Sequence, residues 1–296
     1  MTEFGHLMSM VSSTFIPKRK LGRMAALDSG SFGKIYKTTY DGVDVAVKQI
    51  SNKGESTITA KMRELLLELR VLVRIRHPNV VTFWGTATEF PASENSEVKP
   101  YIGLVFELCD TGSLHNALFE KKMKLSLAQR CKIAYQCSLG LMYLHSKRVI
   151  HRDINPRNIL LSKSLDAKIA DFGCARVLPS NQKSLKTTTI SGSPAYMAPE
   201  QLLGKELTES VDTWGLGVML WEIMMNQKPW EGRFADFNAL KNAIVTGQKL
   251  EIPRSTSFPA TYVNMIKLCM SFKSSERPQM SFVEHELQKA HRHVSQ

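Results

Sequence analysis

Two short polar motifs near the middle of the chain contain residue types that can hold a metal ion and accept a proton. The first spans residues 151–158 (HRDINPRN), and the second spans residues 171–173 (DFG). Apolar residues flank a polar turn between the motifs, which predicts two short strands that fold back and bring Asn158 near Asp171. Amide and carboxylate oxygens suit Mg²⁺, a hard cation that usually binds few protein groups. We therefore expect Asn158 and Asp171 to bind Mg²⁺, and Asp153 to accept a proton from a hydroxyl group.

A lysine closes an apolar strand earlier in the chain. Residues 45–48 (VAVK) place Lys48 on the inward face of the predicted strand, where an unpaired charge would be very costly. Glu68, on the helix predicted next, is the best candidate for its partner, and Glu64, one turn earlier, is the alternative. Such a pair is either a plain salt bridge or a device that positions the phosphates of ATP.

A segment with two glycines precedes this strand at residues 27–35 (LDSGSFGKI). Gly30 and Gly33 have no Cβ, so backbone N–H groups beside them could approach phosphate groups closely. Two glycines in a predicted hairpin more often mark only a turn, and the segment by itself is therefore weak evidence for phosphate binding.

The elements that must position these residues change in type along the chain. Strand-like runs dominate residues 21–106, where Asp41-Gly42 joins two strands and one helix is predicted over 58–75. Helical patterns dominate the rest, for example over 130–145 and 214–225. We expect an α+β fold with two lobes, a small β-rich one and a larger helical one, and a cleft between them of the kind that holds ligands.

The predicted boundaries follow from the same patterns. Residues 1–20 lack clear periodicity and are predicted to be a tail, and a second tail is expected at residues 291–296. Two further strands are predicted over 80–85 and 101–106, separated by an exposed loop. The expected division of the domain over 21–290 is an N-lobe at 21–106, a hinge at 107–113 and a C-lobe at 114–290.

The bulk composition bounds the class of protein. The chain has 296 residues and a net charge of +12, which we interpret as a solvated basic surface because no recognised DNA- or RNA-binding motif accompanies it. Its five cysteines include no C-x-x-C pair and lie mostly in apolar runs, as buried free thiols do, which favours a reducing compartment. We find no transmembrane stretch or secretory signal, and expect a soluble, cytoplasmic domain that binds no nucleic acid.

Together the motifs resemble those of a eukaryotic protein kinase catalytic domain over roughly residues 21–290. Later landmarks agree with the resemblance, namely Ala198-Pro199-Glu200 and residues 212–217 (DTWGLG), and the family implies that Arg277 pairs with Glu200. The resemblance implies ATP and Mg²⁺ as cofactors and proteins as substrates. It implies a catalytic set of Asp153, Lys48, Glu68 and Asn158, with Asn158 and Asp171 on the metal.

The resemblance also implies which residues would contact ATP. Adenine would lie among Ile35, Ala46 and Leu160 and would bond the backbone of residues 107–109, with Phe106 as the gatekeeper beside it. The full set of expected contacts is Leu27, Ser29, Gly30, Ser31, Phe32, Gly33, Ile35, Ala46, Lys48, Phe106, Glu107, Cys109 and Leu160.

The segment at residues 192–200 (GSPAYMAPE) resembles the serine/threonine form of the family, and the chain looks most like the tyrosine-kinase-like group that includes Raf-type and mixed-lineage kinases. Two positions depart from the family pattern: Asp28 replaces a glycine, and Asn155 replaces the lysine usual in serine/threonine kinases. Arg157 matches an arginine of many receptor tyrosine kinases. A dual-specificity kinase and a pseudokinase scaffold are therefore alternatives to an active serine/threonine kinase.

Hydroxyl groups are frequent in the segment between the second motif and Pro199. A phosphate added there could find a charged partner in Arg152, beside Asp153, and order the segment. We expect regulation by an upstream kinase or by autophosphorylation at Thr187, Thr188, Thr189 or Ser191. The alternative is a merely polar, mobile loop.

Overall fold

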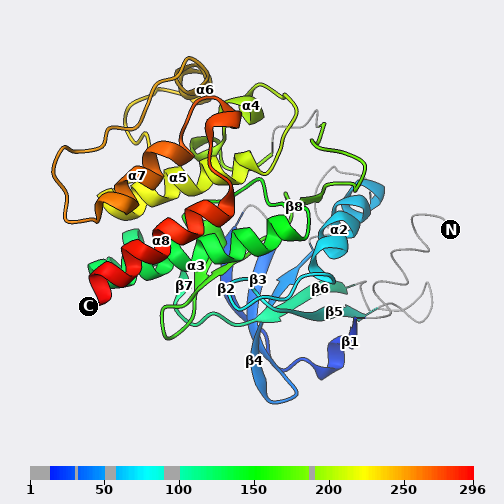
Figure 1. Ribbon diagram of the computed structural model, residues 1–296. Helices are drawn as coiled ribbons and strands as arrows, with labels where there is room; N and C mark the ends of the chain where they lie inside the picture. Colours follow the sequence, from blue (N-terminus) through cyan, green and yellow to red (C-terminus); the bar gives the residue numbers. More distant parts are fainter. Residues whose placement is uncertain (1–13, 31–32, 51–57, 90–100, 187–190) are drawn as a thin grey trace. The chain divides into compact units, whose positions relative to one another are not determined.

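The computed structural model describes residues 14–30, 33–50, 58–89, 101–186 and 191–296. The chain divides into two units (Figure 1). The smaller is formed by Met1–Arg76 and Val81–Asp110, and the larger by His77–Val80 and Thr111–Gln296. The smaller unit contains a sheet and one described α-helix and the larger contains the remaining α-helices, so the prediction of an α+β fold is confirmed.

A six-stranded sheet forms the frame of the smaller unit. Asp41 and Gly42 join its central hairpin with φ values of 46° and 82°, the left-handed backbone that a tight turn between twisted strands requires. The strands lie in the order β1-β5-β6-β4-β3-β2, with bounds β1 Phe15–Pro17, β2 Ala25–Gly30, β3 Gly33–Tyr40, β4 Val43–Gln49, β5 Phe83–Glu89 and β6 Tyr101–Glu107.

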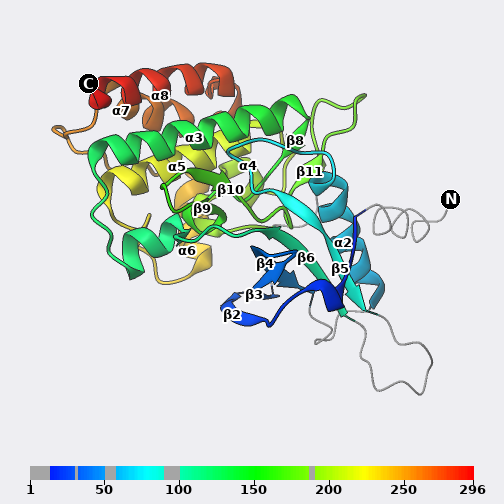
Figure 2. The ribbon, with the colours of Figure 1, turned by 90° about the horizontal axis from the view of Figure 1, so that it is seen from below.

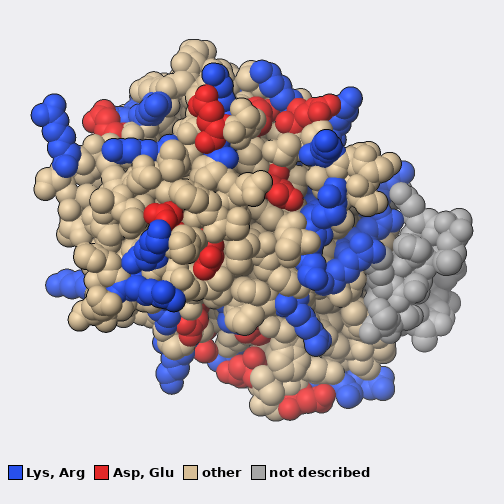
Figure 3. Space-filling model, in the orientation of Figure 1, with Lys and Arg blue, Asp and Glu red and all other residues tan. Residues whose placement is uncertain are grey.

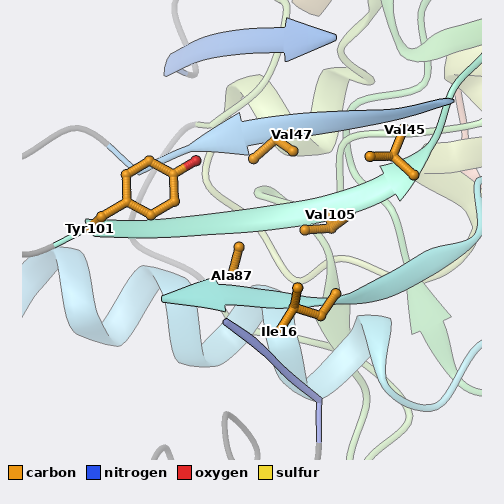
Figure 4. Close-up of a cluster of buried hydrophobic side chains, with 6 residues drawn as sticks. All are labelled: Ile16, Val45, Val47, Ala87, Tyr101 and Val105. Carbon is orange, nitrogen blue, oxygen red and sulfur yellow. The ribbon is translucent and has the colours of Figure 1, made fainter. Parts of the chain in front are cut away.

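Alternation along β4 separates the two faces of this sheet. Val45 and Val47 are fully buried on one face, where they pack with Ile16, Ala87, Tyr101 and Val105 (Figure 4). Lys48 points to the opposite face and meets α2 (Ile58–Leu72), whose leucines at 65, 66, 69 and 72 are buried. The helix expected over 58–75 is thus present and ends three residues earlier.

The strand predicted over 80–85 is shifted along the chain. Val80 forms an isolated parallel bridge with Ile169 in the larger unit, and the strand β5 begins only at Phe83. The apolar run around Val80 therefore supplies residues to both units, and the periodicity of the sequence does not show where one unit ends and the other begins.

Residues 14–20 are not a tail, contrary to the prediction. Phe15–Pro17 form β1, which pairs in parallel with β5, and the amide of Thr86 donates to the carbonyl of Thr14 at 2.8 Å. Ile16 is only 3% exposed. Lys18 adds an ion pair with Glu89 and lies over the Tyr101 ring at 4.8 Å. This short segment therefore covers the apolar face of the sheet.

Replacing Ile16 with alanine is expected to lower the free energy of unfolding by about 2–4 kcal/mol, because it leaves a cavity among β-branched neighbours. Phe15→Ala is the matched control: Phe15 is 53% exposed on the same strand, and its loss should cost within about 0.5 kcal/mol. Urea denaturation of both variants measures the difference. Equal costs would show that β1 does not pack as described.

The larger unit is built on helices that lie side by side (Figures 1 and 2). Ser126 and Gln129 form a reciprocal capping box at the start of α3, and Asn226, with φ 51°, ends α5. Residues 211–224 of α5 are all buried, so this helix is the centre of the unit. The helices are α3 Leu127–Ser146, α4 Pro199–Leu202, α5 Ser210–Met225, α6 Phe237–Val245, α7 Ala260–Cys269 and α8 Met280–Ser295.

The helix α8 continues through residues 291–295, where the sequence analysis expects a tail. Short strands and single-turn helices connect the long helices and carry the polar motifs. One sheet has the order β10-β9-β7 and another pairs β11 with β8. Their bounds are β7 Gly112–Ser113, β8 Val149–Ile150, β9 Ile159–Leu161, β10 Ala167–Ile169 and β11 Arg176–Val177, with η3 at Pro156–Asn158 and η4 at Pro194–Tyr196.

Candidate active site

The buried lysine of β4 pairs with a carboxylate on α2. Lys48 Nζ lies 2.8 Å from Glu68 Oε1, and the two side chains are only 11% and 7% exposed. Glu64, the alternative, is exposed on the neighbouring helical face. The prediction that Glu68 is the partner of Lys48 is confirmed.

The other nucleotide-contact candidates of the smaller unit lie on its central strands. Ile35 pairs with Lys48 between β3 and β4, and Ala46 pairs with Phe106 between β4 and β6. The Phe106 ring contacts that of Phe83, with centroids 5.6 Å apart. These residues share one part of the sheet with the Lys48–Glu68 pair.

Three further nucleotide-contact candidates, Leu27, Glu107 and Cys109, differ in their exposure or in their backbone hydrogen bonds. Leu27 is half-exposed and Cys109 is buried. The Glu107 amide donates to the carbonyl of Thr82 at 3.0 Å, while its side chain accepts from the Thr82 amide at 2.7 Å. The backbone N–H of Glu107 is therefore already engaged.

The glycine segment is described only in part. Gly30, the last residue of β2, pairs with Gly33, the first residue of β3, in antiparallel register. Ser31 and Phe32, between them, lie outside the described residues, and for Ser29 only the backbone is described. Leu160 belongs to the larger unit, where it pairs with Lys168 and Ser113 in the sheet of β9.

Asp153 of the first motif is held by donors from three directions. Its Oδ1 accepts from Asn155 Nδ2 at 2.9 Å and from the backbone N of Ser193 at 2.8 Å. Its Oδ2 accepts from Asn158 Nδ2 at 2.8 Å. A carboxylate offers about four acceptor positions, so the three donors in the described part of the chain leave about one, on Oδ2.

The turn between β9 and β10 brings the two motifs together, as predicted. The strands pair antiparallel with Ile159 opposite Ile169, and the Ala170 amide donates to the Asn158 carbonyl at 2.8 Å. Asn158 uses its Nδ2 on Asp153, which turns its Oδ1 the other way as an acceptor. Asp171 follows with φ 60°, a backbone conformation that is uncommon outside glycine and often marks functional sites.

Asp212 of α5 fixes the backbone of the first motif. Its carboxylate accepts from the amides of His151 and Arg152 at 2.8 and 2.7 Å and lies 3.0 Å from His145 Nε2. Burial acts to raise the pKa of Asp212, but the hydrogen bonds and charges of the two histidines outweigh it and hold that pKa below its usual value. Asp212 thus stays ionised as an internal anchor.

The pair implied between Glu200 and Arg277 is present. Arg277 Nη1 and Nη2 donate to the two carboxylate oxygens at 2.6 and 2.9 Å, and the guanidinium also lies 4.9 Å from the Trp214 ring centroid. This bidentate pair ties α4 to the segment just before α8.

Sequence reasoning missed the contacts of Ser193. In the sequence Ser193 is only one hydroxyl in a polar segment, but in the structure its amide donates to Asp153. Gly192 precedes it with φ 117°, and a Cβ there would lie 3.0 Å from the carbonyl oxygen of Arg152. A glycine directly before Ser193-Pro194 was the available signal that the chain approaches another backbone there.

A second buried carboxylate holds the segment after Ser193. Tyr196 Oη donates to Glu222 Oε2 at 2.6 Å, and Glu222 Oε1 is buried with no hydrogen-bond partner among the described residues. Burial raises the pKa of Glu222 to about 7, although Tyr196, Arg157 and Lys228 oppose the shift. Glu222 therefore changes charge near neutral pH.

This shift predicts pH-dependent stability. Because the pKa of Glu222 is about 7 in the folded protein, protonated Glu222 contributes about 3 kcal/mol to the free energy of unfolding. This contribution is complete below about pH 4.5 and is lost as the pH rises through 7. Glu222→Gln should remove this slope between pH 5 and 8 in urea denaturation. Glu231→Gln, at an exposed site nearby, is the control and should keep it. An unchanged slope in Glu222→Gln would refute the assignment.

The surface charge, the length of the helices and the grouping of possible metal ligands bear on three other expectations. Figure 3 shows basic side chains spread over one face with acidic side chains among them, in line with a solvated basic surface. In the described part of the chain, no helix combines the length and the apolar character needed to cross a bilayer. No group of three or more His, Cys, Asp or Glu residues able to hold a metal ion occurs in the described ranges.

Proteins of similar sequence include several that are named protein kinases. A Dictyostelium discoideum protein named "Probable serine/threonine-protein kinase" is 35% identical over 258 residues, covering 87% of this chain and 26% of its own length. The serine/threonine-protein kinase CTR1 of Arabidopsis thaliana is 30% identical over 275 residues, 90% of this chain and 31% of its own. A second Dictyostelium protein, kinY, is 31% identical over 270 residues, 88% of this chain and 46% of its own.

The chain therefore spans less than half the length of these relatives, between 26% and 46%. The family model for protein tyrosine and serine/threonine kinases matches residues 21–287, which covers every motif described above. The chain belongs to the protein tyrosine and serine/threonine kinase family.

Proposed function

We propose that the chain is an ATP-dependent protein kinase that transfers the γ-phosphate to serine and threonine hydroxyls of proteins. The observation that carries the proposal is the buried carboxylate of Asp153. Three donors among the described residues hold it, and they leave about one acceptor position open, on Oδ2. A carboxylate so arranged can accept the proton of one hydroxyl in one orientation.

The residues present fit ATP and Mg²⁺. Asn158 Oδ1, turned away from Asp153, and the Asp171 carboxylate are hard oxygen donors, and a site with so few protein ligands is typical of Mg²⁺ with phosphate. Lys48, fixed by Glu68, offers an ammonium group for phosphate oxygens. When bound, the magnesium nucleotide supplies the phosphoryl group and neutralises its charge.

The chain's own residues then have distinct parts in the reaction. Lys48 would bind phosphate oxygens, with Glu68 keeping the ammonium group in place. Asp153 would orient the substrate hydroxyl at Oδ2 and take its proton as the oxygen attacks. Asn158 would hold both the metal and Asp153, since its amide nitrogen and oxygen serve different partners.

Serine and threonine are the proposed acceptors for two reasons. The relatives described above are all named serine/threonine-protein kinases. The segment Gly192–Glu200, which resembles the serine/threonine form, lies directly beside Asp153 through Ser193.

The five cysteines are all buried and free of disulfides, which supports a reducing, intracellular location.

Phosphorylation of the segment before Gly192 is the proposed mode of regulation. Thr187, Thr188 and Thr189 lie outside the described residues. Ser191 is described, half-exposed, with its Oγ 2.9 Å from Cys174 Sγ. A phosphate added to this segment could pair with the guanidinium group of Arg152 and so order the segment.

One experiment tests these proposals together. The purified chain is incubated with ATP, Mg²⁺ and a generic protein substrate, and phosphosites on both proteins are mapped by mass spectrometry. Phosphoserine and phosphothreonine are expected on the substrate. Phosphotyrosine alone would refute the acceptor class, and nucleotide binding without any transfer would instead support a pseudokinase scaffold.

A further inference from the structure

Asn155 is the least expected residue of the first motif, because its side chain is neutral where the family pattern predicts lysine. It is 1% exposed and lies in extended backbone, with φ −159° and ψ 164°, at the start of η3. Its Oδ1 accepts from the Arg157 amide at 2.9 Å, which is an ordinary helix cap. Capping accounts for the oxygen of this amide group but not for its nitrogen.

The nitrogen faces two acceptors from different parts of the chain. Asn155 Nδ2 lies 2.9 Å from Asp153 Oδ1 and 3.2 Å from Ser193 Oγ, which is 38 positions later. It also lies 3.1 Å from the Asp153 carbonyl. One buried amide therefore bridges the carboxylate proposed as base and the segment at Ser193.

The bridge is closed by the backbone of that segment. The Ser193 amide donates to the same Asp153 Oδ1, at 2.8 Å. Gln201 Nε2 donates to the carbonyls of both Arg152 and Ser191, at 2.9 and 3.1 Å, so the segment is pinned to the motif on its other side. Gly192 permits the approach, since a Cβ there would lie 3.2 Å from Asp153 Oδ1.

We propose that Asn155 is a positioning residue that ties Asp153 to Ser193, so that Oδ1 is occupied and Oδ2 alone faces the substrate hydroxyl. One of the three donors on the carboxylate, the Ser193 amide, belongs to the segment at Ser193, and a second, Asn155 Nδ2, also lies within hydrogen-bond distance of Ser193 Oγ. Displacing that segment releases the carboxylate to rotate, which couples the base to the order of the segment. This inference rests on the proposed function, because it assigns Asp153 the role of base.

The test separates the donor of Asn155 from its cap. Asn155→Asp keeps the acceptor for the Arg157 amide but replaces the donor by a second carboxylate beside Asp153. Asn155→Ser keeps both a capping oxygen and a hydroxyl donor. We expect Asn155→Asp to lower kcat by about tenfold to a hundredfold, the range for losing a hydrogen bond to a charged group. KM for ATP should stay within about twofold, and Asn155→Ser should recover most of kcat.

A second measurement does not depend on catalysis. Amide hydrogen exchange at Ser193 should be faster in Asn155→Asp by at least about threefold, because its acceptor Asp153 is pushed away, and close to wild type in Asn155→Ser. Should wild type transfer no phosphate, the proposed function fails, and exchange at Ser193 still decides whether Asn155 forms the tie. Unchanged exchange in Asn155→Asp, or kcat within twofold of wild type in a folded variant, would overturn the inference.

Discussion

Replacing Asp153 with asparagine is expected to lower kcat for phosphate transfer by about 10³-fold, within the range for loss of a general base. An amide cannot accept the hydroxyl proton at neutral pH. It also turns an NH₂ group toward donors that now point at the carboxylate, so about 1–3 kcal/mol of stability should be lost as well. Initial rates of label transfer from ATP, with urea denaturation of the same preparations, measure both effects.

The matched control is the same substitution at an exposed aspartate. Asp44 lies on β4 in a surface ion pair with Lys37, and Asp44→Asn should change kcat by less than about twofold. Transfer by Asp153→Asn at more than a tenth of the wild-type rate would remove Asp153 from the mechanism. It would leave the three donors as a purely structural arrangement.

Local patterns were enough to predict the elements that carry the site. The Asp41-Gly42 turn, the helix before His77 and the strand that carries Lys48 each follow from residues close together in the sequence. The partner of Lys48 could be narrowed to two glutamates because a buried ammonium group needs a carboxylate. Helical phase favoured Glu68, and the structure agrees.

Contacts between distant segments could not be predicted in the same way. β1 has only three residues, too few for any period, and its position depends on pairing with Thr86, Ala87 and Thr88. The bridge from Asn155 to Ser193 spans 38 positions and depends on the path of the chain between them. Asn155 drew notice as a departure from a family pattern, yet no local rule shows what replaces the missing ammonium group.

Removing the charge of Lys48 is the second substitution with a large expected effect. Lys48→Met should lower kcat/KM for ATP by about 10²–10³-fold, comparable to loss of one preorganised donor to a developing charge. Glu68→Gln should have a smaller effect in the same direction, since it loosens the ammonium group but leaves it present. Glu64→Gln, one helical turn away and exposed, is the matched control and should behave as wild type.

The variants at Lys48 and Glu68 do not separate a phosphate-binding lysine from a plain salt bridge, because each weakens a buried ion pair and destabilises the smaller unit. The double variant Lys48→Met/Glu68→Leu does. Replacing both members of a buried pair by apolar residues often restores stability, so the free energy of unfolding should return to within about 1 kcal/mol of wild type. If Lys48 binds phosphate, transfer stays as low as in Lys48→Met. If the pair is only structural, transfer recovers with stability, and Lys48 is then no part of the active site.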